Sequence, residues 1–341
     1  MVVSGTESRV LRADSGQTVI LRPAFPRSGR RAHRRPALTP TLILAAAFLS
    51  GLLLPPLAAV SPKLVAGFLA VALLLTEISR PTASSADPRL RPLLLFGALR
   101  FAVLPPLLFW TANALIPDLA HGVGLLALVP VGVAAPTLTR AAGGDTRRSS
   151  VLLAITTVLF VCWMFVLQRF VAAASAWSLA AQVAAIALLP LVVAGPLRRG
   201  LYRCGLSWTL RYASHAALFL VALTIAVVTA RSRQVVSTRP SGLAALAGVA
   251  LGEFVLFYLV AGCFCRASGE EDSVSYVVPS GFNNNVLGAV LAAIYLSPLT
   301  ALFMAASNPV CSLVFLAWSG CHRRFWRPVR EAGQPASQSD R

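Results

Sequence analysis

The sequence predicts an all-α integral membrane protein with ten transmembrane helices. Three observations lead to this prediction: 57% of the residues are apolar, only 12% are charged, and long apolar runs recur from residue 41 to residue 320. A soluble domain of 341 residues would not have enough polar surface to cover itself at this composition. Lipid is therefore the expected solvent for most of the chain.

The apolar runs divide the transmembrane region, 41–320, into two halves of five spans each. The predicted spans are 41–60, 63–79, 92–115, 120–142 and 149–172 in the first half, and 176–197, 213–231, 241–265, 274–297 and 299–320 in the second. Residues 1–40 carry eight arginines and two acids, which predicts a disordered basic tail. An Arg-rich organellar targeting segment is the alternative for these residues. Residues 321–341 are predicted to form a second tail.

The distribution of basic residues predicts the orientation of the chain in the membrane. The net charge is +18, and arginine supplies 29 of the 30 basic residues. With ten spans, 24 of these 30 residues fall on the side of the two termini. The positive-inside rule then places both termini in the cytoplasm, with the protein in the plasma membrane or a bacterial inner membrane. Because no basic stripe is interleaved with aromatic residues, nucleic-acid binding is not expected.

The sequence predicts neither a metal or cofactor site nor an enzyme. Cys263 and Cys265 form a C-x-C pair, but no second pair and no spaced histidines accompany it. The spans contain no H-E-x-x-H, G-x-S-x-G or paired-aspartate motif, so an intramembrane enzyme is disfavoured.

Two of the predicted spans are interrupted by Pro, Gly and polar residues. The breaks are centred near Pro136 in the fourth span and Pro279 in the ninth. Pro and Gly are common in membrane helices, and an asparagine can simply tie helices together. However, a transmembrane helix loses backbone hydrogen bonds only where the freed groups meet protein, water or substrate. Because the breaks occupy corresponding places in the two halves, we predict a transporter's central binding site there, with substrate contacts from Thr137, Thr139, Ser280, Asn283, Asn284 and Asn285.

Two stretches beside these breaks resemble one known family. AAPTLTRAAGGD (134–145), which runs into SSVLLAITT, is similar to the fourth-to-fifth helix region of the bile acid:sodium symporter family, and PSGFNNNVLGAVLAA (279–293) is similar to its ninth helix. The resemblance implies two inverted five-helix repeats with broken helices 4 and 9 that cross near the middle of the membrane. It also implies a core (helices 3–5 and 8–10) that moves against a panel (helices 1, 2, 6 and 7). Members carry organic anions coupled to sodium by alternating access.

Most positions that match the family's sodium ligands hold unsuitable residues. They are Ala135 and Pro136 on helix 4, Leu153 on helix 5, Pro279 on helix 9 and Arg100 on helix 3. Asn283 and Asn284 keep the amide character of the ninth helix, and Ser149 matches a family serine and is a weak candidate for ion binding. A guanidinium has donors only and cannot coordinate a cation. We therefore expect sodium coupling at these positions to be lost, which leaves a proton or another ion as the coupling ion.

Arg100 and Glu253 are charged residues inside the third and eighth spans, and each precedes a phenylalanine. A charge in the middle of a span costs about 2.5–3.5 kcal/mol on insertion scales, so it should be paired or hydrated. We predict a buried ion pair between the two residues beside the crossing, with the guanidinium in place of sodium. Two alternatives stay open. Arg100 could bind an anionic substrate with Glu253 as a proton-coupling carboxylate, or Arg100 could extend to the membrane interface.

These observations predict a secondary transporter of a small organic solute. Helix N-termini beside the breaks favour an anion such as a carboxylate or sulfonate. A non-transporting sensor or scaffold is an alternative, as is an arsenite-type efflux permease, which the lack of a cysteine near Pro136 disfavours. Glu77, near the end of the second span, is interpreted as the partner of Arg80 at the membrane interface.

Overall fold

The structure is a computed structural model that describes residues 10–12, 18–20, 38–79, 90–167, 176–238 and 242–325. Seven helices in these ranges are long and apolar enough to cross a membrane. Two further apolar helices, Thr39–Leu53 and Asn285–Tyr295, are shorter. Large apolar side chains such as Trp110 and Phe219 are exposed on the helix surfaces, as expected for helices in lipid. The protein is therefore an all-α, multi-pass membrane protein, as predicted.

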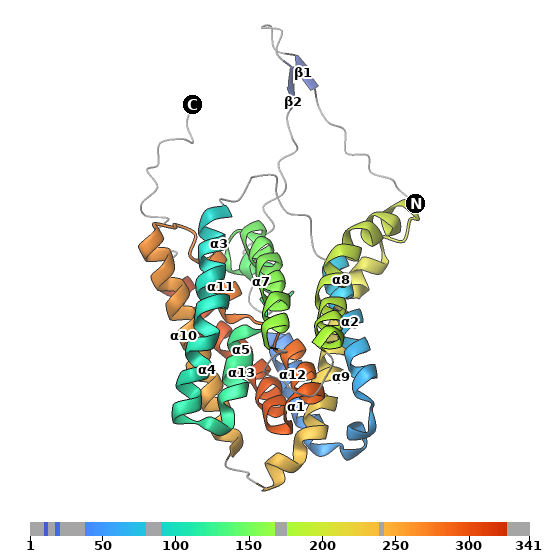
Figure 1. Ribbon diagram of the computed structural model, residues 1–341. Helices are drawn as coiled ribbons and strands as arrows, with labels where there is room; N and C mark the ends of the chain where they lie inside the picture. The colour runs from blue at the N-terminus through green and yellow to red at the C-terminus, as the bar shows by residue number, and fades with distance from the viewer. Residues whose placement is uncertain are drawn as a thin grey trace. The chain divides into compact units, whose positions relative to one another are not determined.

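The helices follow the predicted spans closely (Figure 1). In chain order they are α1 (Leu38–Leu53), η1 (Pro55–Ala59), α2 (Pro62–Ser79), α3 (Leu90–Ala98), η2 (Leu99–Val103), α4 (Leu104–Leu115), η3 (Pro117–Leu119), α5 (Ala120–Leu128), α6 (Ala135–Ala142), α7 (Thr146–Leu167), α8 (Ala176–Arg203), α9 (Thr209–Thr238), α10 (Gly242–Ser268), α11 (Val274–Gly281), α12 (Asn285–Tyr295) and α13 (Pro298–Phe325). The predicted fourth span corresponds to α5 and α6, and the predicted ninth to α11 and α12.

The ends of the transmembrane region differ slightly from the prediction. Helix α1 begins at Leu38 rather than near residue 41, and α13 continues to Phe325 beyond residue 320. Within residues 1–40, which were predicted to be disordered, strands β1 (Val10–Arg12) and β2 (Thr18–Ile20) pair antiparallel. Most of the remaining tail residues, including 326–341, lie outside the described ranges.

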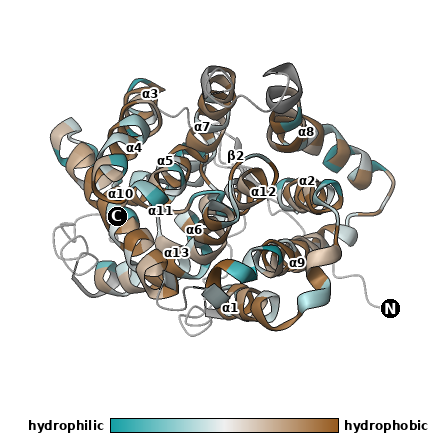
Figure 2. Ribbon diagram, turned by 60° about the horizontal axis from the view of Figure 1, so that its bottom comes forward, coloured by the Kyte–Doolittle hydropathy of each residue, from teal (hydrophilic) through white to brown (hydrophobic). Residues whose placement is uncertain are grey.

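The transmembrane helices pack as two groups that also contact each other, with α13 on α9 and α1, and α7 on α8. In the first helix group, α9 packs on both α1 and α2, and α2 packs on α8. The second helix group contains α3 to α7 and α10 to α13, in which α13 packs on α10 and α12, and α4 on α5. Apolar residues predominate along the helices of both groups (Figure 2).

The third predicted span contains a π-helical turn, η2, between α3 and α4. Pro105 and Pro106 follow this turn and have no backbone N–H, so carbonyl groups of the preceding turn lose their usual helical partners. The Trp163 indole of α7 donates a hydrogen bond to one of them, the carbonyl of Phe101, at 2.9 Å. The π-helical turn also carries Arg100, whose side chain is completely buried.

Candidate functional site at the helix crossing

Two unwound segments cross inside the second helix group. The first lies between α5 and α6, and the second, Phe282 to Asn284, lies between α11 and α12. They pair through their backbones: Gly132 N donates to Phe282 O at 2.6 Å, and Asn284 N donates to Pro130 O at 2.8 Å. This pairing forms a short antiparallel bridge between Val131 and Asn283. Each segment therefore forms hydrogen bonds with backbone groups that the break in the other helix leaves without a helical partner.

The prolines lie at the edges of the breaks, not at their centres as predicted. Pro136 lies in the first turn of α6, where a missing N–H costs no helical hydrogen bond. Pro279 lies in the last turns of α11, and the chain unwinds three residues later. The breaks themselves are centred on Val131 and Asn283.

Gly132 allows the two backbones to approach this closely. A Cβ atom at this position would lie 2.9 Å from Phe282 O and 3.1 Å from Asn283 O. Both of these atoms belong to the backbone of the partner segment, so a side chain could be accommodated only if the crossing moved apart.

Side chains satisfy the carbonyl groups left at the C-terminal ends of α5 and α11. Asn283 Nδ2 donates to Leu126 O at 3.0 Å, and the Cys311 thiol of α13 donates to Gly281 O at 3.2 Å. At the opposite edges, Thr156 Oγ1 accepts from Val131 N at 3.1 Å, and Asn284 Oδ1 accepts from Leu287 N at 3.2 Å as the cap of α12.

Arg100 joins the two helix ends. Its Nη1 donates to Ala127 O at 2.7 Å, while Nε and Nη2 donate to Ser280 O at 3.3 and 3.2 Å. Its guanidinium carbon lies 3.4 Å from the ring centroid of Phe257 on α10 and 4.6 Å from that of Phe101. The C-terminal ends of helices carry partial negative charge, and an aromatic face attracts a cation. The guanidinium therefore occupies a cation site built from neutral groups.

Arg100 and Glu253 are both buried, but no hydrogen bond joins them. Glu253 on α10 is 6% exposed, and neither of its carboxylate oxygens has a hydrogen-bond partner among the described residues. Arg100 and Glu253 are close enough to attract each other electrostatically. Arg100 donates instead to carbonyl groups that the broken helices leave free, and the buried ion pair with Glu253 stays a prediction. Because Arg100 is completely buried, the alternative that it extends to the membrane interface is wrong.

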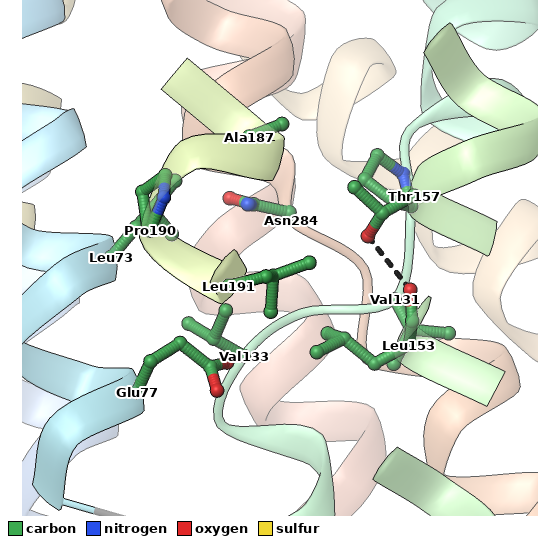
Figure 3. A pocket seen from close by; sticks show the side chains of 11 residues that line it. Leu73, Glu77, Val131, Val133, Leu153, Thr157, Ala187, Pro190, Leu191 and Asn284 are labelled. Carbon is green, nitrogen blue, oxygen red and sulfur yellow. Dashed lines mark hydrogen bonds between the residues drawn. The ribbon is translucent and has the colours of Figure 1, made fainter. Parts of the chain in front are cut away.

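A cavity lies where the crossing faces α2 and α8. It is narrow and is lined mainly by apolar side chains. Its polar lining consists of Glu77 from α2, Thr157 from α7 and Asn284 from the second unwound segment. Figure 3 shows Asn284 projecting between α8 and α7, with Glu77 on the side of Val133, while Thr157 Oγ1 donates to Leu153 O at 2.7 Å.

Of the six predicted substrate contacts, only Asn284 lines this cavity. Ser280 and Asn283 are buried beside Arg100 and the crossing, and the Ser280 hydroxyl donates to Phe257 O at 2.9 Å. Asn285 and Thr139 are also buried, and each keeps a side-chain oxygen without a hydrogen-bond partner among the described residues. Thr137 is exposed on α6. Direct contact between these residues and a substrate stays a prediction.

Ser149, the weak candidate for ion binding, is completely buried at the start of α7, and its hydroxyl has no partner among the described residues. In the described ranges, no group of three His, Cys, Asp or Glu side chains could hold a metal ion.

Three contributors to this region were not predicted from the sequence. The predicted partner of Glu77, Arg80, lies outside the described residues, and the structure shows in addition that Glu77 is largely buried and lines the cavity. Its position as an acid inside an otherwise apolar span was the signal that could have identified it. The hydroxyl of Thr156 and the thiol of Cys311 complete the crossing, but the sequence carries no signal that assigns them partners far along the chain.

The comparisons with known proteins agree with the resemblance inferred from the sequence. Residues 88–239, which include α3 to α9, match the model of the Sodium Bile acid symporter family. This range includes the first unwound segment and Arg100, but neither Glu253 nor the second unwound segment. A search of curated proteins found no match. The family match confirms the predicted resemblance: residues 88–239 of this membrane protein are similar to the Sodium Bile acid symporter family.

Proposed function

We propose that this protein is a secondary transporter that carries a small organic solute by alternating access through the cavity beside the crossing. The observation that carries this proposal is the backbone pairing of two unwound segments next to a cavity whose other wall is formed by α2 and α8. In transporters, broken helices that meet near the middle of the bilayer form substrate sites. The match to a transporter family supports the same class of function over an enzyme.

The two helix groups correspond to the moving parts of this mechanism. The first helix group would act as the panel and the second as the core, in two inverted repeats of five spans with both termini in the cytoplasm of a cell membrane. A hydrogen bond from Tyr295 of α12 to Gln182 of α8 joins the groups. Because this bond lies at the end of α12 distant from the crossing, it would break when the groups separate there.

The lining of the cavity limits the kinds of solute that fit. Eight of its eleven residues are Leu, Val, Pro or Ala, so we expect a predominantly apolar solute with few polar groups. The N-termini of α6 and α12 beside the crossing favour an anion. Because Glu77 also belongs to the lining, a solute panel should contain each carboxylate together with its neutral amide.

Arg100 makes sodium binding at the crossing unnecessary in this proposal. Its guanidinium already places a positive charge against the carbonyl groups of Ala127 and Ser280. A sodium ion in the same place would be repelled and would find these oxygens occupied. We therefore expect transport that does not depend on sodium.

The test is uptake of a labelled panel, beginning with cholate as a bile acid, into vesicles that contain the full chain. Uptake is compared with sodium against choline as the external cation, and with and without a pH gradient. The variant Ala187→Phe should reduce uptake because it fills the cavity, whereas Val192→Phe, which is 70% exposed on the same helix, should not.

The outcomes separate the candidate functions. Sodium-independent uptake that decreases in the Ala187→Phe variant supports the proposal. Uptake that strictly depends on sodium contradicts the role given to Arg100. If no member of the panel crosses the membrane but some raise the melting temperature, the sensor or scaffold alternative is favoured. The arsenite-type alternative gains no support from the cavity, whose lining contains no cysteine.

A further inference from the structure

Glu253 is a buried carboxyl group without a hydrogen-bond donor. It lies in the middle of α10, between the buried residues Ala250 and Phe254, and both of its oxygens lack partners among the described residues. An ionised carboxylate in an apolar interior is costly unless it receives hydrogen bonds, whereas the protonated form carries no charge. The contacts around Glu253 therefore favour the protonated form in this conformation.

Arg100 does not require Glu253 as a counter-ion. The carbonyl groups of Ala127 and Ser280 and the face of Phe257 hold the guanidinium. Because all three are neutral, Glu253 can take up a proton without leaving an unsolvated cation behind. When the proton leaves, Arg100 is close enough to stabilise the carboxylate by electrostatic attraction. The same surroundings therefore accommodate Glu253 both as a neutral carboxylic acid and as a carboxylate.

Among the described residues, the other elements that pack on α10 place no second charged side chain close enough to act electrostatically on Glu253. These elements are α3, α5, α11 and α13. Arg100 is the one described charged side chain that acts electrostatically on Glu253. The remaining titratable residues on these elements and on α10 itself are Arg91 and His121, which are exposed, then Tyr258, Cys263, Cys265, Arg266, Tyr276, Cys311, Cys321 and His322, and Arg323 and Arg324 at the end of α13.

We infer that Glu253 is a proton-binding site and that its proton is the coupling ion of the proposed transport. On release, the carboxyl O–H bond breaks, the electron pair stays on the carboxylate near Arg100, and the proton passes to water. The coupling role rests on the proposed function. Proton binding rests only on the contacts of Glu253 and Arg100.

Infrared spectroscopy of the purified full-length protein tests proton binding without any solute. We expect a carboxylic-acid band at neutral pH that disappears in Glu253→Gln and shifts in Glu253→Asp. The exposed Glu271, just beyond α10, supplies the control, because Glu271→Gln should keep the band. Raising the pH should replace the band by a carboxylate signal in the wild type and in Glu271→Gln, but not in Glu253→Gln. Glutamine closely resembles protonated glutamate, so Glu253→Gln should also fold.

Two results would overturn the inference. One is an acid band that is the same in the wild type and in Glu253→Gln, and the other is a wild-type protein that lacks the band at neutral pH. The aspartate variant reports on the same group if the glutamine variant fails to fold. Since no readout uses a solute, a failure of the transport proposal would appear in the uptake panel and would leave this result intact.

Discussion

Arg100 in the π-helical turn donates two hydrogen bonds to the carbonyl oxygen of Ser280, at 3.3 and 3.2 Å, across 180 positions of the chain. A third bond to Ala127 O ties the same guanidinium to the end of α5. One side chain therefore holds the ends of two half-helices together. This arrangement gives the crossing a permanent positive charge.

Replacing Arg100 by lysine should destabilise the protein although the charge is kept. An ammonium group has no planar fork that can reach both helix ends and also stack on Phe257. We expect a loss of about 1–3 kcal/mol, the usual cost of leaving a buried acceptor unsatisfied. Thermal unfolding in detergent measures this, with Arg91→Lys on the exposed side of α3 as the control. Equal melting temperatures for the two variants would contradict the role of the guanidinium fork.

Gly132→Ala should force the two unwound segments apart. Its Cβ would lie 2.9 Å from Phe282 O, and overpacking a tight contact costs about 1–3 kcal/mol. The control is Gly252→Ala on α10, where a Cβ meets no atom within 4 Å. Unfolding in detergent should show a lower melting temperature for the first variant and an unchanged or higher one for the second. A neutral effect of Gly132→Ala would show that the crossing is loosely packed.

Asn283→Leu should weaken the crossing by removing the donor to Leu126 O. Leucine has a similar volume, so the expected loss of about 1–3 kcal/mol comes from the unsatisfied carbonyl group rather than from a void. Asn113→Leu on the exposed side of α4 is the matched substitution and should be nearly neutral. If hydrogen exchange of the α5 and α12 amides were the same in the wild type and Asn283→Leu, the assigned role would be wrong.

Tyr295→Phe should loosen the contact between the two helix groups. It removes only the hydroxyl that donates to Gln182, and the ring stays in place. Amide hydrogen exchange should rise near the end of α12 and the start of α8, because separation of the groups there becomes easier. Tyr202→Phe on α8, where the tyrosine is 60% exposed, is the control. Unchanged exchange in Tyr295→Phe would mean that other contacts hold the groups together.

The sequence alone determined the membrane class, the approximate helix bounds and the presence of two breaks. These features follow from apolar run length and from Pro and Gly, which act locally on the backbone. The charges of Arg100 and Glu253 also stood out, because any charge within an apolar span must be stabilised by its surroundings.

Only the tertiary structure decided which groups stabilise those charges. Arg100 binds carbonyl groups that exist as free acceptors only because α5 and α11 end where they do, so Glu253 is left without a donor. Likewise, Glu77 lines the cavity because α2 faces the crossing. The Cys311 thiol donates to Gly281 O because α13 packs against the end of α11. Such partners are distant in the chain, and their choice depends on which backbone groups remain unpaired after the helices have packed.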